Sequence, residues 1–316
     1  NLTLRYNACS LSNETTIVAL LIITTILWAF SFSLIGEYLA GSVDSYFSVL
    51  MRVGLAALVF LPFLRTRGQS PRTIVLYMLV GEMQLGIMYL LAFRAYLYLT
   101  VSEFLLFTVF TPLYITLIYD LLSGRKLRWG YLLSAALAVL GAAIIRYDKV
   151  SDHFWTGLLL VQLSNLCFAI GMVGYKRLME VRPMPQHNAF AWFYVGAFIV
   201  AVAAWFMLGN AQKLPTTTLQ WSVLVWLGVV ASGLGYFMWN YGATQVDAGT
   251  LGIMNNVHVP AGLLVNLAIW QEQPHWPSFI SGALVILASL WVHRRWVAPH
   301  SGQTADDRRR GSAQSE

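Results

Sequence analysis

Long apolar stretches, separated by short polar segments, follow one another from Ile17 to Trp296. A helix that crosses about 30 Å of hydrocarbon needs roughly 20 mostly apolar residues. Ten stretches have about this length, so the pattern predicts an all-α polytopic membrane protein with ten transmembrane helices. We place these helices at residues 17–37, 46–64, 73–92, 95–119, 129–146, 155–176, 189–208, 219–241, 248–270 and 277–296.

The ten predicted helices fall into two related sets of five. The third and eighth helices carry the same residue types at the same spacing, and the fourth and ninth follow with a shift of one residue. The matched positions are Gly81, Gly86 and Tyr89 with Gly228, Gly233 and Tyr236, then Ala95 and Pro112 with Ala243 and Pro260. Because five is odd, the second set crosses the membrane in the opposite sense, which predicts inverted repeats with the substrate between them. The aligned prolines predict discontinuous helices beside that site.

Composition and charge orient this arrangement in a membrane. Hydrophobic residues make up 58% of the chain and charged residues 11%, against about 25% charged in a soluble domain. With both termini in the cytoplasm, fifteen Lys and Arg residues fall on the inner side and four on the outer side. This is the positive-inside pattern, so the net charge of +6 reflects membrane topology and does not indicate a nucleic-acid partner.

The predicted organisation is a tail, two five-helix repeats and a second tail. These segments are a cytoplasmic N-terminal tail at 1–16, a first repeat at 17–150, a second repeat at 151–297 and a disordered cytoplasmic C-terminal tail at 298–316. Both tails are polar and contain little that could form a packed core.

Polar side chains inside the predicted helices indicate where a solute binds, because each costs a few kcal/mol in hydrocarbon unless it faces protein or water. The candidates are Arg52, Glu103, Asn165, Asn255, Asn256 and His258, with Arg94 at the outer mouth. Asn255 and His258 share one helical face, and the repeat offset aligns that face with the one that carries Glu103. These groups predict a shared central cavity. The alternative is that Glu103 pairs with Arg52 or Arg94 and that His258 caps a neighbouring carbonyl.

Aromatic residues accompany these polar groups. Trp28, Tyr89, Tyr236 and Trp239 lie within the first, third and eighth predicted helices. Aromatic walls with a few directional polar groups suit a small, ring-containing solute. The alternative is that these rings only pack the helices together.

Catalytic, metal and cofactor motifs are not found in the sequence. The predicted helices carry no Ser/His dyad, paired Asp residues or His-Glu-x-x-His site, so an intramembrane enzyme is the disfavoured alternative. Cys9 and Cys167 give no metal-binding spacing, and the chain has no Walker-type ATP-binding sequence. We therefore expect a transporter without a cofactor or an ATPase site of its own.

Several of these residues resemble a known family. The run Leu27-Trp28-Ala29-Phe30-Ser31-Phe32, Arg52 in the second helix and the Gly-rich third and eighth helices resemble the EamA-type branch of the drug/metabolite transporter superfamily. Residues 102–120, 182–194 and 235–256 are similar to bacterial inner-membrane biotin importers of the carboxylate/amino acid/amine transporter group. The resemblance implies alternating-access uptake of biotin across that membrane. Import or export of amino acids or other small carboxylate or amine metabolites is the alternative.

The chemistry of biotin fits the candidate residues. Its ureido ring has a carbonyl acceptor and two N–H donors, which Asn165, Asn255, Asn256, Glu103 or a Tyr hydroxyl could partner. Its apolar bicycle suits a wall that contains Trp28, Tyr89 or Trp239. Its carboxylate needs a cation, for which we expect Arg52, with Arg94 as the second choice. Glu103 is the candidate proton carrier, should uptake be coupled to protons.

Overall fold

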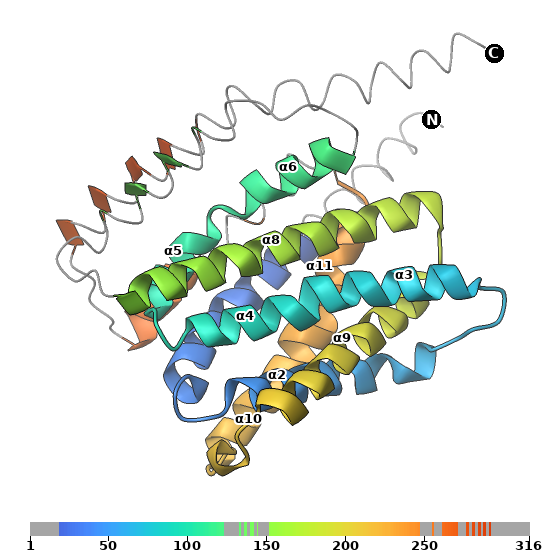
Figure 1. The fold of residues 1–316 in the computed structure, drawn as a ribbon, viewed down its shortest axis with the longest axis horizontal. Helices are drawn as coiled ribbons and strands as arrows, with labels where there is room; N and C mark the ends of the chain where they lie inside the picture. Colours follow the sequence, from blue (N-terminus) through green and yellow to red (C-terminus); the bar gives the residue numbers. More distant parts are fainter. Residues whose placement is uncertain are drawn as a thin grey trace, which may run out of the picture.

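The computed structural model describes residues 19–122, 152–246 and 261–270, together with single positions between 133 and 144, at 255 and between 276 and 291. The described residues form helices and contain no strand (Figure 1). Seven of the helices are long and apolar enough to cross a membrane. They are Ala19–Leu39, Ser45–Phe63, Pro71–Ala95, Val101–Leu122, His153–Val181, Gln186–Leu208 and Thr218–Ala243. These seven confirm seven of the ten predicted helices.

The other three predicted helices lie wholly or partly outside the described residues. The segments 129–146 and 277–296 are described only at single positions, and of the segment 248–270 the structure describes 255 and a shorter apolar helix, Ala261–Trp270. The predicted start of the fourth helix at residue 95 is wrong. The chain turns after Ala95, and the helix begins at Val101, because the Thr100 side chain accepts a hydrogen bond from the Glu103 backbone and ends the turn.

Polar caps define where several helices begin. Asp44 precedes α2 (Ser45–Phe60) and accepts a hydrogen bond from the Phe47 backbone N–H. Thr100 and Glu103 form a reciprocal capping box at the start of α5 (Val101–Thr108). Thr217 caps α10 (Thr218–Trp226) in the same way with Gln220. These side chains satisfy backbone donors that would otherwise be exposed at the helix ends.

The membrane helices Pro71–Ala95 and Thr218–Ala243, which correspond to the third and eighth predicted helices, each contain a π-helical segment in the middle. The third consists of α3 (Pro71–Gly81), η3 (Glu82–Ile87) and α4 (Met88–Ala95), and the eighth of α10, η6 (Leu227–Leu234) and α11 (Gly235–Ala243). Both π segments fall in the Gly-rich stretches that the sequence aligns with an offset of 147 residues. Such local widening of a helix is often found at functional sites.

Glycines bring these two helices close to their neighbours. A Cβ atom on Gly81 would lie 1.9 Å from the Phe193 carbonyl oxygen, and one on Gly228 would lie 2.7 Å from the Leu55 Cβ. The third helix therefore packs closely on α9 (Gln186–Leu208), and the eighth packs in the same way on α2. The helices α2 and α9 also pack on each other, and this contact joins the two pairs.

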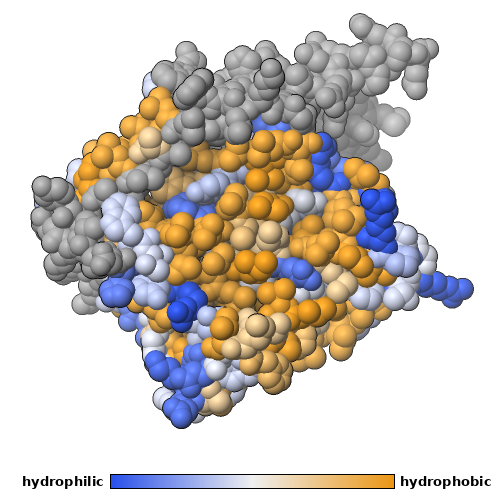
Figure 2. Space-filling view, viewed as in Figure 1, coloured by the Kyte–Doolittle hydropathy of each residue, from blue (hydrophilic) through white to orange (hydrophobic). Residues whose placement is uncertain are grey.

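The long helix α8 (Asp152–Val181) lies between α4 and α6 (Thr111–Leu122), as Figure 1 shows. Side chains that face outward from the bundle are largely apolar, among them Leu58, Leu159 and Phe206. Figure 2 shows the apolar surface over the middle of the helices, with most of the polar side chains toward their two ends. Helices of this length with an apolar surface indicate a multi-pass membrane protein.

The fourth membrane helix is interrupted beside Pro112. The α5 helix ends at Thr108 and α6 begins at Thr111, with a turn at Val109 and Phe110. Pro112 has no backbone N–H, so it cannot complete the helical hydrogen bond to the carbonyl of Thr108, and the Thr111 hydroxyl donates to that oxygen at 2.7 Å. This confirms the predicted discontinuity in the first half, whereas Pro260 lies outside the described residues.

Candidate functional site

A cavity lies between the membrane helices of the two halves of the chain. Its walls come from the first and second membrane helices, α4, α5, α6, α8, α11 and the position of Asn255. The lining residues are Trp28, Ser31, Phe32, Ile35, Arg52, Met88, Tyr89, Ala92, Phe93, Tyr96, Phe104, Thr108, Thr111, Ser164, Asn165, Phe168, Tyr236 and Asn255. Its volume is about 70 Å³, which is room for several water molecules.

Arg52 is the charged residue in this wall. It lies on α2 with 3% of its surface exposed, and its Nε donates a hydrogen bond to the Ser232 hydroxyl at 2.5 Å. Its guanidinium carbon lies 4.1 Å from the centre of the Tyr89 ring. Among the described residues, no carboxylate lies within ion-pair distance of Arg52. A buried cation without an anionic partner is costly, so this site favours an anionic ligand.

Ser232 connects Arg52 to the π segment η6 and to α9. Its hydroxyl lies 2.9 Å from the Tyr89 hydroxyl, and its backbone carbonyl accepts a hydrogen bond of 2.6 Å from the Tyr194 hydroxyl. The Tyr194 hydroxyl also lies 3.0 Å from the Gly233 carbonyl. The Tyr194 hydroxyl is therefore an extra donor shared between two carbonyl groups of η6, where the widened helix leaves backbone acceptors available.

Aromatic rings from three helices form another part of the wall. The Trp28 ring lies 4.8 Å from the Tyr236 ring and 6.2 Å from the Phe168 ring. The Trp28 indole N–H donates to the Ala231 carbonyl at 3.1 Å, which fixes the orientation of the ring. Trp239 lies 5.0 Å from Trp28, but it is fully buried and does not line the cavity. It therefore supports Trp28 from behind.

Two buried polar atoms in the wall have no hydrogen-bond partner among the described residues. They are the Tyr96 hydroxyl and the Asn255 Nδ2, on side chains that are 6% and 2% exposed. The Tyr96 ring stacks on Phe104 with the ring centres 4.2 Å apart. Burial raises the pKa of the Tyr96 hydroxyl well above its usual value, so the group stays protonated and can donate. Unpartnered buried polar atoms are rare, and here they border a cavity.

Asn165 and Ser164, on α8, stabilise the backbone around the cavity. The Asn165 Nδ2 donates to the Phe107 carbonyl at 2.9 Å, and the Ser164 hydroxyl donates to the Met88 carbonyl at 3.1 Å. The Phe107 carbonyl lies one residue before the end of α5, so the Asn165 amide links α8 to the interrupted part of the fourth helix.

Six of the eleven residues that the sequence proposed for the site meet in this cavity. They are Trp28, Arg52, Tyr89, Asn165, Tyr236 and Asn255. Arg94 lies outside the wall, with its guanidinium carbon 5.8 Å from the Tyr46 ring centre. Glu103 also lies outside the wall, and one of its carboxylate oxygens accepts a hydrogen bond from the Thr100 backbone at 2.9 Å. Asn256 and His258 lie outside the described residues.

The alternative pairing of Glu103 with Arg52 or Arg94 is not found among the described residues. Neither Arg52 nor Arg94 forms an ion pair with a carboxylate in the part of the chain that the structure describes. Sequence analysis also missed Tyr96 and Ser232. Tyr96 lies in the turn after α4, whereas the sequence prediction placed it within the fourth helix at 95–119. Ser232 belongs to the Gly-rich stretch of the eighth predicted helix, where the glycines and not the serine carry the match between the repeats.

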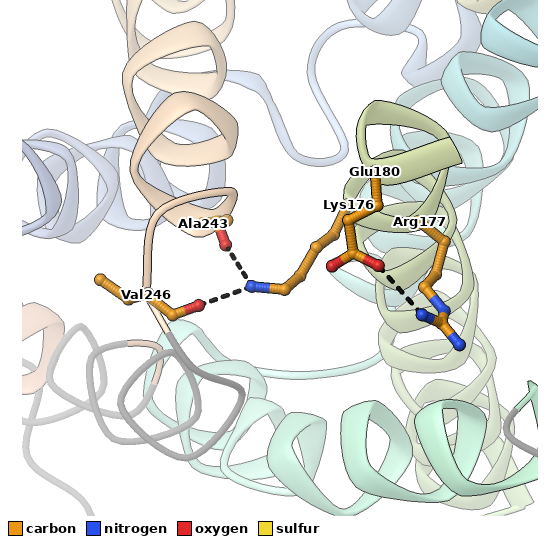
Figure 3. A network of polar contacts seen from close by, with 5 residues as sticks. All are labelled: Lys176, Arg177, Glu180, Ala243 and Val246. Atoms are coloured by element: carbon orange, nitrogen blue, oxygen red, sulfur yellow. Dashed lines mark hydrogen bonds and ion pairs between the residues drawn. The ribbon is translucent and has the colours of Figure 1, made fainter. Parts of the chain in front are cut away.

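A separate polar network closes the end of α11 (Figure 3). The Lys176 Nζ, on α8, donates to the carbonyl oxygens of Ala243 at 3.1 Å and Val246 at 2.6 Å. Arg177 forms an ion pair of 3.0 Å with Glu180 on the same helix. A cation at the last carbonyls of a helix is favourable. The Lys176 hydrogen bonds join α8 to the end of α11. None of these residues lines the cavity, so the network has a structural role.

Known proteins resemble this chain in sequence and in fold. A biotin transporter of Escherichia coli (strain K12) is 83% identical over 299 residues, covering 95% of this chain and 100% of that protein. A probable biotin transporter of Pseudomonas aeruginosa is 55% identical over 87% of this chain and 96% of that protein. A solved crystal structure with 16% identity has a TM-score of 0.62 over 88% of this chain and 97% of that one, which supports the fold. Residues 15–147 and 155–294 match the EamA-like transporter family, and the chain belongs to that family.

Proposed function

We propose that this chain imports biotin across a bacterial inner membrane as a secondary transporter. The identity of 83% to a protein named as a biotin transporter supports the substrate. The observation that carries the site is Arg52, a buried cation without a carboxylate partner among the described residues, in the wall of a cavity between the two halves. Such a cation suits the carboxylate of a small amphipathic acid.

The transporter consists of ten helices in two inverted five-helix repeats, 17–150 and 151–297, with both termini in the cytoplasm. The equivalent π segments η3 and η6 support the repeat, as does the similar packing of the third helix on α9 and of the eighth on α2. The two matches to the transporter family also support it. The excess of Lys and Arg on one side supports the orientation. The substrate then binds between the repeats and is released by alternating access.

Biotin binds with its carboxylate at Arg52 and its rings toward Trp28 and Tyr236. The guanidinium group is held at Nε by Ser232, so the terminal nitrogens are available to the carboxylate. The bicycle packs on the aromatic wall. Arg94 attracts the anion at the outer mouth before it reaches Arg52.

The ureido ring binds at the other polar groups of the cavity. The Asn255 Nδ2 and the Tyr96 hydroxyl have no partner among the described residues, and both can donate to the ureido oxygen. Asn165 is a second amide in the cavity wall, and Asn256 and His258 follow Asn255 closely in the sequence. Trp239 supports the aromatic wall. Glu103 holds the start of α5, next to the residues that line the cavity.

The cavity must widen when biotin enters. A volume of about 70 Å³ holds water molecules but not a bicyclic solute with a valerate chain. The structure therefore corresponds to a contracted state, and the walls separate as the transporter opens to one side.

Uptake into proteoliposomes tests this function. Purified protein is reconstituted, and the entry of radiolabelled biotin is compared with that of radiolabelled amino acids. We expect uptake of biotin that excess unlabelled biotin abolishes and that amino acids do not reduce. Uptake of amino acids in the absence of biotin uptake would assign the chain to the alternative, a transporter of amino acids or other small metabolites.

A further inference from the structure

An apolar groove lies on the surface of the bundle between α2 and α9, apart from the substrate cavity. Its volume is about 450 Å³. It is lined by Leu50, Met51, Gly54, Leu55, Ala57, Leu58, Leu61, Leu64, Ala191, Val195 and Phe198. None of these residues lines the cavity. The small residues Gly54, Ala57 and Ala191 leave the space between the two helices, while the exposed side chains of Leu58 and Leu61 border it.

The length of the groove matches one leaflet of a bilayer. Its residues extend along α2 from Leu50 to Leu61, the first residue of the short helix η2 (Leu61–Phe63), which at 1.5 Å per residue is about 16 Å. Half of the hydrocarbon core of a bilayer is about 15 Å thick. The groove therefore extends from Leu50, a few residues before the midpoint of the span Ser45–Phe63, to Leu64 beyond the end of that span, which is room for one acyl chain.

Cations follow the groove at the Leu64 end. Arg65 and Arg67 come directly after its last residue, both exposed, and no described residue forms a hydrogen bond or ion pair with either guanidinium group. The Arg65 backbone is held against α9 on both sides. Its N–H donates to the Asn188 Oδ1 at 3.0 Å, and its carbonyl accepts from the Trp192 indole at 3.2 Å. The first arginine is therefore fixed beside the wall of the groove, and Trp192 is a residue typical of the headgroup layer.

We propose that this groove and the two arginines bind an anionic phospholipid. One acyl chain lies in the groove, and the headgroup phosphate contacts Arg65 and Arg67. A basic cluster at the cytoplasmic end of membrane helices attracts anionic headgroups, and arginine is well suited to phosphate. A basic loop alone can bind only the headgroup, whereas the groove also holds an acyl chain of the same lipid.

Charge argues against a second copy of the protein in the groove. In a two-fold dimer with its axis along the membrane normal, the same surface of each copy meets its partner. Arg65 and Arg67 of one copy would then lie close to the same residues of the other, and like charges would repel. An anionic lipid instead neutralises them.

Lipid binding by the purified protein tests the proposal. The protein is delipidated in detergent and titrated with phosphatidylglycerol or phosphatidylcholine that carry identical acyl chains, and bound lipid is counted by native mass spectrometry. The variants are Arg65→Gln with Arg67→Gln, Ala57→Phe to fill the groove, and Arg177→Gln as the control, because Arg177 is a partly exposed arginine already paired with Glu180. Val195→Phe fills the groove from α9 and replaces Ala57→Phe should the latter not fold.

We expect the wild type to prefer phosphatidylglycerol by about 25-fold, since each arginine near the surface contributes about fivefold. The double arginine variant loses this preference, the groove-filling variant binds both lipids less tightly, and Arg177→Gln behaves as the wild type. Equal binding of the two lipids by the wild type would overturn the proposal. So would unchanged binding in the groove-filling variant, or a wild-type dimer that Ala57→Phe converts to a monomer.

Discussion

Replacement of Arg52 by alanine should weaken the binding of biotin while leaving the protein folded. Hydrogen bonds to a charged group contribute about 1.5–3 kcal/mol, so we expect the Kd for biotin to rise about 10- to 150-fold. The residue lies in the wall with 3% of its surface exposed and has no carboxylate partner in the described part of the chain. Its loss therefore removes a buried charge that no described residue neutralises, and we expect no fall in thermal stability.

The methyl ester of biotin makes this measurement specific to the carboxylate. Binding of biotin and of the ester to the wild type and to Arg52→Ala is measured by isothermal titration calorimetry, which completes a double-mutant cycle. The wild type should prefer biotin to its ester by about the same factor that Arg52→Ala loses, and the variant should bind both alike. Arg52→Lys should give an intermediate affinity, because the charge remains but the planar, two-pronged group is lost.

A different pattern would refute this reasoning. If Arg52→Ala lowers the melting temperature and binds biotin as tightly as the wild type does, Arg52 stabilises the fold through Ser232 and Tyr89 and takes no part in binding. If the variant loses affinity equally for biotin and for the ester, the arginine shapes the cavity but does not bind the carboxylate. Arg177→Ala, at a partly exposed site, is the matched control for removal of an arginine.

Three further predictions concern other parts of the account. Tyr96→Phe keeps the stack on Phe104 and removes a hydroxyl that lacks a described partner. We therefore expect an unchanged melting temperature and a Km for biotin uptake about 2- to 10-fold higher. An unchanged Km would show that Tyr96 does not contact biotin. Glu103→Gln can retain the capping box of α5, so its melting temperature should match the wild type. Glu103→Ala should lower the free energy of unfolding by about 0.5–2 kcal/mol. A stable Glu103→Gln protein that loses concentrative uptake would instead identify Glu103 as a proton carrier. In a background without Cys9 and Cys167, an impermeant thiol reagent applied to intact cells should label Lys213→Cys but not Arg67→Cys, and the reverse result would invert the topology.

The sequence was sufficient to predict the seven described membrane helices and the break beside Pro112, but not the π segments. Hydropathy depends on composition over a whole turn or more, so it located seven membrane helices to within a few residues in most cases. Hydropathy placed the start of the fourth helix too early, at residue 95, because the segment from Tyr96 to Leu99 is also apolar. The Thr100-x-x-Glu103 capping pattern marks the true start and is readable in the sequence. The π segments η3 and η6 could not be predicted, because hydrogen-bond register leaves no trace in hydropathy.

The site was predictable where a side chain was conspicuous in its surroundings. Arg52 and Trp28 were identifiable because a cation within an apolar helix is costly and therefore indicates a function, and a large ring at mid-helix needs space beside it. Ser232 does not, since a hydroxyl in a membrane helix can bond to its own backbone at little cost. Trp239 lies three residues after the wall residue Tyr236 on the same helix, but its ring packs behind Trp28. Only the packing between helices decides which of these two rings borders the cavity.

A structure of the protein with biotin bound, determined in lipid nanodiscs, tests the central claim most directly. The account predicts biotin between the two halves, its carboxylate oxygens within hydrogen-bond distance of the Arg52 guanidinium and its rings against Trp28 and Tyr236. Biotin bound elsewhere, or bound in the cavity with its carboxylate directed away from Arg52, would contradict it.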